Sequence, residues 1–208
     1  MTDFLGLGSI ATVSFITLLI AFRRQDISII LYVALALRLL ATYFGHYITP
    51  LPDSTADAIT FERQAWVLGE DGFFNLIKLL SSPTLGEYSS LTSGFISWLI
   101  AIPYSLFGRS MLMAQSISIF FGILCIVLGW KLSIELWDKK VAKKVAWTIA
   151  LFPSLILYSV LVLREVYVSF FLLLAIYGVC IWVKTQSLKS FIIAITGFAI
   201  ATLFHGSI

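Results

Sequence analysis

The sequence predicts an all-α, polytopic membrane protein with about six transmembrane helices. Of its 208 residues, 60% are hydrophobic and only 12% are charged, and the mean hydropathy is +0.99. The hydrophobic residues form runs of roughly 20 residues, the length at which an α-helix crosses a bilayer. Such a composition excludes a soluble globular domain.

Six apolar segments are long enough to span a membrane, and short polar or charged breaks separate them. They are Phe4–Phe22, Ile27–Ile48, Ser110–Trp130, Val145–Leu163, Val166–Val183 and Ser190 to the end of the chain. The first segment has no basic residues before it and no cleavage site after it, so we expect a retained span with its N-terminus outside. A seventh, shorter segment, Leu91–Phe107, decides the topology.

The basic residues indicate how the chain is oriented. If Leu91–Phe107 crossed the membrane, the basic loop 138–144 would lie opposite the basic segment 23–26, against the positive-inside rule. If Leu91–Phe107 lies in the outer interface instead, both segments and the link 184–189 become cytoplasmic. Pro103 and the aromatic residues of this segment also suit a helix at headgroup depth. The sequence therefore predicts a large outer loop over residues 49–109.

This outer loop is acidic and amphipathic. Residues 49–90 contain six acids against two bases, Asp53, Asp57, Glu62, Glu70, Asp71 and Glu87 against Arg63 and Lys78. The stretch DAITFERQAWVLG predicts a short helix that ends at Gly69, and FFNLIKLL (Phe73–Leu80) predicts a second one. We expect both to be juxtamembrane helices within a single membrane domain, residues 1–208.

The net charge of +3 does not indicate a nucleic-acid partner. The basic residues form short clusters between spans and no continuous stripe. Cys125 and Cys180 lie in apolar segments, where neither a disulfide nor a metal site can be argued from spacing. Membrane lipids are the partners that this pattern favours.

Asp53 and Asp57 are the first candidates for catalysis. If the helix begins early they share one face, and if it begins near Asp57 then Asp53 lies in the preceding loop beside Pro52. Two carboxylates at the outer surface suit a general base, or ligands to Mg²⁺ or Mn²⁺. The alternative is that both residues only cap the helix and offset its dipole.

Arg164 and Glu165 interrupt a long apolar stretch and form the second candidate site. They mark a tight outer turn between two spans, on the same side as the acidic residues. Because the turn lacks Gly, Pro, Asn and Asp, the charges can instead occupy a cavity. The alternative is an ordinary polar hairpin.

Arg38 lies near the middle of the second span, where a charged side chain is costly and suggests a functional role. It can pair with a carboxylate or bind a lipid phosphate, and the alternative is that it extends to the interface. His46 and His205 lie near the outer ends of their spans. Of these, His205 is a candidate for substrate binding, with a structural role as the alternative.

The order of these features resembles the N-terminal module of the GT-C membrane glycosyltransferases. The resemblance covers residues 27–208 and rests on a D-A-x-x-F-x-x-x-A stretch from Asp57 to Ala65, LFG-S near Ser110, ELWDKK (135–140), a span with Pro153 and a charged outer turn. The superfamily includes protein mannosyltransferases, the aminoarabinose transferase of lipid A and oligosaccharyltransferase catalytic subunits. One span precedes the family's usual first span.

This resemblance implies an enzyme that transfers a sugar from a polyprenyl-phosphate-linked donor on the outer face of a bacterial plasma membrane. It implies catalytic roles for Asp57, with Asp53 as second choice, and for Glu165. If the reaction uses a metal ion, Asp57 and Glu165 would hold it. Arg164 and Arg38 would offset the phosphate charge. The family's C-terminal half is missing, so we expect a fragment of a longer protein.

Two rival functions remain open. The ending FHGSI resembles a stretch of exopolysaccharide or O-antigen repeat-unit polymerases. A non-enzymatic carrier or flippase for a lipid-linked substrate would instead use the charged residues to line a path.

Overall fold

The computed structural model describes residues 2–55, 57–80 and 91–205, and these contain helices and no strands. In chain order, the helices are α1 (Thr2–Arg23), η1 (Gln25–Ile27), α2 (Ser28–Tyr47), α3 (Asp57–Gly69), α4 (Phe73–Leu80), α5 (Leu91–Phe107), α6 (Met111–Leu136), α7 (Lys139–Leu151), α8 (Pro153–Val160), α9 (Glu165–Thr185) and α10 (Leu188–His205).

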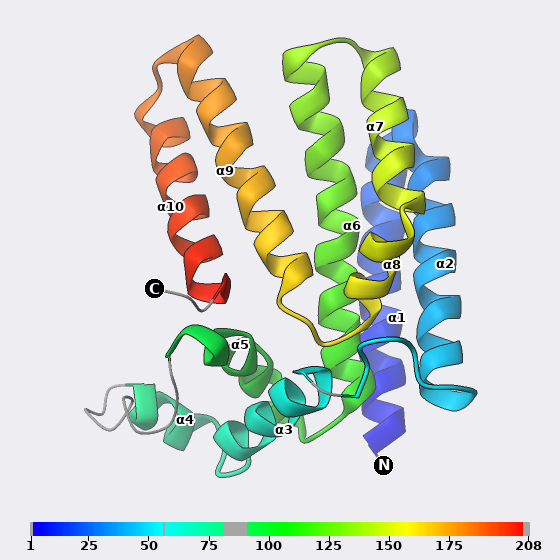
Figure 1. Cartoon of the computed structure of the whole chain (residues 1–208), viewed down its shortest axis with the longest axis vertical. Coiled ribbons are helices and arrows are strands. Elements are labelled where there is room, and N and C mark those ends of the chain that lie inside the picture. The colour runs from blue at the N-terminus through cyan, green and yellow to red at the C-terminus, as the bar shows by residue number, and fades with distance from the viewer. Residues whose placement is uncertain (1, 56, 81–90, 206–208) are drawn as a thin grey trace.

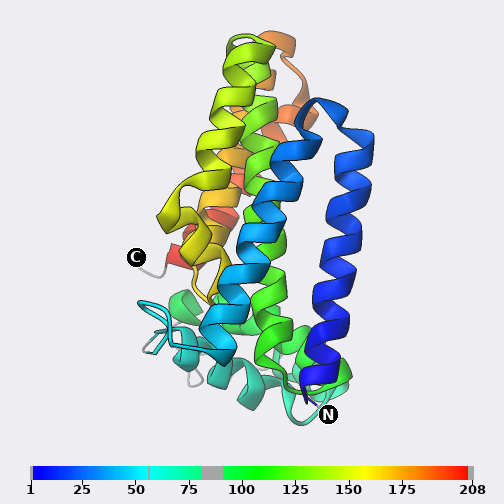
Figure 2. The same cartoon turned by 90° about the vertical axis from the view of Figure 1, so that its right-hand side faces the viewer.

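The long helices run side by side as a bundle, and α3, α4 and α5 lie together at one end of it (Figure 1). We call these three helices the end layer. The second view shows the same arrangement, with the end layer beneath the long helices (Figure 2). Helix α3 ends at Gly69 and α4 covers Phe73–Leu80, as the sequence predicted, and α5 covers the segment predicted to lie in the interface.

The three turns that carry basic clusters lie at the end of the bundle opposite the end layer. They join α1 to α2, α6 to α7 and α9 to α10 (Figures 1 and 2). The acidic residues of α3 and the basic turns are therefore at opposite ends of the molecule.

Length and composition support four to five spanning helices among the described residues. The four are α1, α2 with η1, α6 and α9, and the bent pair α7 and α8 makes a fifth if it counts as one span. Helices α5 and α10 are apolar but shorter, so a sixth span at α10 stays a prediction. Large apolar side chains are exposed on the bundle, including Phe15, Phe22, Ile29 and Ile176. This surface and these lengths are those of an integral membrane protein.

The predicted span Val145–Leu163 is not one straight helix, because the structure divides it into two helices that together are long and apolar enough for a broken span. Helices α7 and α8 meet at an angle of 57°. Phe152, between them, has extended backbone angles (φ −66°, ψ 118°), and Pro153 is the first residue of α8. Proline lacks an N–H and disfavours helical geometry in the residue before it, so the helix breaks there.

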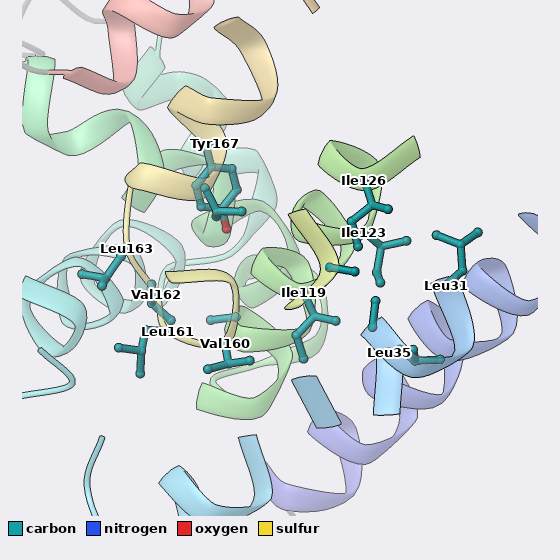
Figure 3. Close-up of a cluster of buried hydrophobic side chains, with 14 of the residues drawn as sticks. Leu31, Leu35, Ile119, Ile123, Ile126, Val160, Leu161, Val162, Leu163 and Tyr167 are labelled. Carbon is teal, nitrogen blue, oxygen red and sulfur yellow. The ribbon is translucent and has the colours of Figure 1, made fainter. Parts of the chain in front are cut away.

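Helix α6 lies at the centre of the bundle and carries most of the core. It packs against α1, α2, α7, α8 and α9. In its most apolar stretch 67% of the residues are buried, against 17% in that of α1. Figure 3 shows Ile119, Ile123 and Ile126 of α6 between Leu31 and Leu35 of α2 on one side and the segment around Tyr167 on the other. The segment Leu161–Leu163 is buried too, so the α8–α9 turn lies inside the protein.

Candidate functional site

Asp57 is the first residue of α3, and Asp53 lies in the loop before it. Both side chains are exposed. Asp53 has φ 61°, a left-handed conformation that aspartate tolerates better than most residues. Of the two geometries that the spacing allowed, the structure has the second, in which α3 begins at Asp57. Asp57 is an acidic residue in the first turn, where the helix dipole favours a negative charge.

A cavity of about 190 Å³ lies beside the start of α3. Its walls come from the end of α2, the loop into α3, the start of α6 and the α8–α9 turn, and they include Thr55, Ala58, Gln115 and Leu161. We call it the site cavity. Asp57 stands between Thr55 and Ala58 in the chain. Gln115 lines this cavity, and its buried Oε1 has no hydrogen-bond partner among the described residues. Rotation of the Gln115 side chain would present this oxygen as an acceptor to an O–H or N–H group in the cavity.

Arg38 is fully buried in the middle of α2, with 0% of its surface exposed. Its Nη1 donates to the carbonyl oxygens of Ala34 and Ala150, at 3.2 and 3.4 Å. Its Nε and Nη2 have no partner among the described residues. The Arg38 side chain therefore does not extend to the membrane interface, which was the alternative to a functional role.

Glu165 begins α9, and its two carboxylate oxygens face different surroundings. Oε1 lies 3.8 Å from Nε of Arg164, whereas Oε2 is buried and has no partner among the described residues. Glu165 and Arg38 line one small cavity of about 10 Å³, together with Gly122, Tyr158 and other residues. Of the two charged residues of the turn, Glu165 lines this cavity and Arg164 does not.

A third polar cluster joins the end layer to the bundle. Glu62 of α3 is buried, and Arg109 donates to both of its carboxylate oxygens, Nε to Oε1 at 2.9 Å and Nη2 to Oε2 at 2.8 Å. The Tyr104 hydroxyl lies 3.0 Å from Glu62 Oε1 and 2.9 Å from the carbonyl oxygen of Ser110. We call Glu62, Tyr104 and Arg109 the end-layer clasp. Two parallel charge-assisted hydrogen bonds make this the most directional ion pair among the described residues.

The clasp also shifts the protonation of its members. Hydrogen bonding to the Glu62 carboxylate raises the pKa of Arg109 above its ordinary value. Burial, and then the negative charge of Glu62, raise the pKa of Tyr104 well above its ordinary value of 10.0. Arg109 therefore stays charged and Tyr104 neutral under ordinary conditions.

An apolar cavity of about 460 Å³ lies between α1, α5 and α6. Leu5, Val13, Pro103, Phe107 and Ile117 are among the residues that line it. It lies where the long helices α1 and α6 meet helix α5 of the end layer. Its lining suits a hydrocarbon chain.

The structure brings together only some of the residues predicted from sequence. Arg38 and Glu165 share a cavity, but Asp57 does not line it. His46 lines the site cavity. His205 is the last residue of α10, and its side chain lies outside the described part of the chain, as does Glu87. Among the described residues, no group of three or more His, Cys, Asp or Glu side chains converges, and Mg²⁺ or Mn²⁺ binding stays a prediction.

Sequence reasoning counted Glu62 among the acids but did not select it, and it did not select Arg109 or Gln115. For Glu62 a signal was present, because it lies on the buried face of α3 with Ala58, Ala65 and Gly69. A carboxylate at this helical spacing on an apolar face requires a partner. Arg109 and Gln115 carry no comparable local signal.

Comparisons of the chain with protein families, with curated proteins and with solved structures found no match.

Proposed function

We propose that the chain is part of an integral membrane glycosyltransferase that uses a polyprenyl-phosphate-linked sugar donor. The observation that carries the proposal is the site cavity. It lies next to the helix start that bears Asp57, and one of its lining residues, Gln115, has a buried Oε1 without a partner among the described residues. A sugar is rich in hydroxyl groups, and a buried acceptor without a protein partner favours a ligand of that kind.

The apolar cavity between α1, α5 and α6 supports a lipid-linked donor. It lies at the end-layer side of spanning helices, where an isoprenoid chain enters from the bilayer while its phosphate stays at headgroup depth. A soluble donor would have no use for this cavity. The two cavities together suit a molecule with one apolar and one hydroxylated part.

In this proposal the end layer faces the outside of a bacterial plasma membrane, α10 is the sixth span and α5 lies in the outer interface. The basic turns gathered at the other end (Figure 1) support this orientation, since basic loops are retained in the cytoplasm.

Asp57 is the proposed general base. The acceptor oxygen forms a bond to the anomeric carbon of the sugar as the bond from that carbon to the donor phosphate breaks. Asp57 takes the proton of the acceptor hydroxyl, and polyprenyl phosphate leaves. Its exposure suits this task, because the acceptor must reach the carboxylate from outside. Arg164 is the proposed partner for the phosphate charge, and Asp53 is the second choice as base.

The test measures release of polyprenyl phosphate by the full-length protein in proteoliposomes, with a panel of labelled polyprenyl-phosphate sugars. Asp57→Asn should lower the rate about 100-fold or more, the usual contribution of a general base. Glu70→Gln is the matched control, because Glu70 is an exposed carboxylate just beyond the same helix. Near-normal release by Asp57→Asn would overturn the assignment, and a larger loss in Asp53→Asn would move the role to Asp53.

Three further outcomes separate the alternatives. Loss of release on chelation, with recovery on adding Mg²⁺ or Mn²⁺, would establish a metal requirement. Lengthening of a lipid-linked repeat unit would identify a polymerase. Movement of the labelled lipid between leaflets without release of polyprenyl phosphate would identify a carrier and contradict the proposal.

A further inference from the structure

Arg38 and Glu165 each have buried polar atoms without a hydrogen-bond partner among the described residues. These atoms are Nε and Nη2 of Arg38 and Oε2 of Glu165. Both residues line the cavity of about 10 Å³ between α2, α6, α8 and α9. Arg38 is fully buried, and unsatisfied N–H groups on a buried charge are costly in a protein interior, and more so at membrane depth. The Glu165 side chain is 43% exposed, but its Oε2 is buried.

The size of this cavity limits what can occupy it. A volume of about 10 Å³ accessible to a water-sized sphere corresponds to roughly one water molecule. A sugar or a phosphate group is too large. The opposite charges of Arg38 and Glu165 also disfavour a lone anion or a lone cation, since either ion would face a like charge.

The chemistry of the lining suits water. A water molecule accepts a hydrogen bond from an Arg38 N–H and donates one to Glu165 Oε2, which satisfies both groups at once. Tyr158 and Ser169 also line this cavity and bear hydroxyl groups that can complete the coordination. A buried water makes about three such bonds.

We propose that Arg38 and Glu165 bind one water molecule between them, and that this water-bridged ion pair holds the α8–α9 turn in position. Arg38 is then a positioning residue and not a ligand of the donor phosphate. The buried turn follows directly before Glu165, and its residues Leu161 and Val162 form part of the wall of the site cavity. The water site does not depend on the proposed function. Only an effect of this site on sugar transfer would rest on that function.

The direct test is a structure of the full-length protein in lipid nanodiscs by electron cryomicroscopy, at a resolution that shows ordered water. We expect one density peak about 2.6–3.2 Å from an Arg38 nitrogen and from Glu165 Oε2. A direct ion pair with no intervening peak, or density larger than one water, would overturn the proposal.

A double-mutant cycle tests the coupling in solution. Glu165→Gln should lower the melting temperature in detergent by about 10 °C, because it leaves the buried charge of Arg38 unpaired. Arg38→Met should lower it by about 5 °C, because 43% of the Glu165 side chain is exposed and water screens its charge. The double variant should recover at least half of the summed loss. Additive losses would contradict the proposal. Glu135→Gln is the control, since it removes an ion pair with Lys184 between half-exposed side chains and should shift the melting temperature by only about 1–2 °C.

Hydrogen–deuterium exchange distinguishes positioning from general destabilisation. In Glu165→Gln, exchange should rise over residues 161–168 under conditions where exchange in α1 is unchanged. Arg38→Lys keeps a cation and should lose less than half of what Arg38→Met loses. If Arg38→Met does not fold but the double variant does, the result still supports the coupling. If neither Arg38→Met nor the double variant folds, while Glu165→Gln is as stable as wild type, the result contradicts the coupling.

Discussion

Arg109, just before the start of α6, holds Glu62 of α3 through two parallel hydrogen bonds of 2.9 and 2.8 Å. The two residues are 47 positions apart in the chain. Glu62 is 4% exposed, whereas 46% of the Arg109 side chain is exposed. The pair therefore joins the end layer to the start of the central helix of the bundle, and Arg109 is its solvent-exposed member.

Removing Arg109 should loosen the end layer. In Arg109→Ala, Glu62 stays buried, and the Tyr104 hydroxyl is its one remaining side-chain partner among the described residues. The expected cost lies between that of losing a surface ion pair and that of breaking a buried one, about 2 kcal/mol. A melting temperature about 5 °C lower is expected by differential scanning fluorimetry in detergent.

Arg63→Ala is the matched control for this change, because Arg63 is an exposed arginine on the same helix. It should leave the melting temperature within about 1 °C. Equal losses in both variants would show that the Glu62 pair contributes nothing of its own.

Tyr104 should make stability depend on pH in the alkaline range. Its folded-state pKa is raised above the ordinary 10.0, so between pH 10 and that higher value the unfolded chain loses the proton first. Stability is complete below pH 10 and falls as the pH rises further. Melting temperatures from pH 8 to 11 should decline less steeply in Tyr104→Phe, and identical slopes would refute this origin.

Gly122 should be sensitive to the addition of a methyl group. A Cβ built there would lie 2.5 Å from Ser159 Cβ and 3.1 Å from Arg38 Nε. Gly122→Ala should therefore push α8 away from α6 and lower the melting temperature by about 5 °C. Gly8→Ala is the control, since its Cβ would meet nothing within 4 Å and alanine favours a helix. A loss as large in Gly8→Ala would contradict the packing argument.

Cysteine labelling in spheroplasts tests the orientation. In a chain with Cys125 and Cys180 replaced by alanine, Glu70→Cys should react with a membrane-impermeant maleimide, and Lys140→Cys should react only after permeabilisation. A tag added after Ile208 should be accessible from outside if α10 is the sixth span. The reverse pattern would invert the proposed topology and remove the outer location of Asp57.

The helices of the end layer could be predicted from sequence almost to the residue. Helix α3 ends at Gly69 and α4 covers Phe73–Leu80, as the amphipathic spacing indicated. These boundaries are local, because they depend on periodicity and on residues that end helices. The division of Val145–Leu163 was missed, since a proline in an apolar run is compatible with a kinked span or with two separate helices.

Sequence alone determined that the chain is helical and apolar enough for a membrane, that its acids and bases belong to different segments, and that Arg38 and Glu165 are unusual where they stand. These properties depend on composition and spacing. Only the tertiary structure decided that Glu62 pairs with Arg109, that Gln115 faces a cavity and that Arg38 shares one with Glu165. Such pairings depend on which helices pack together, and packing joins residues far apart in the chain that no local pattern relates.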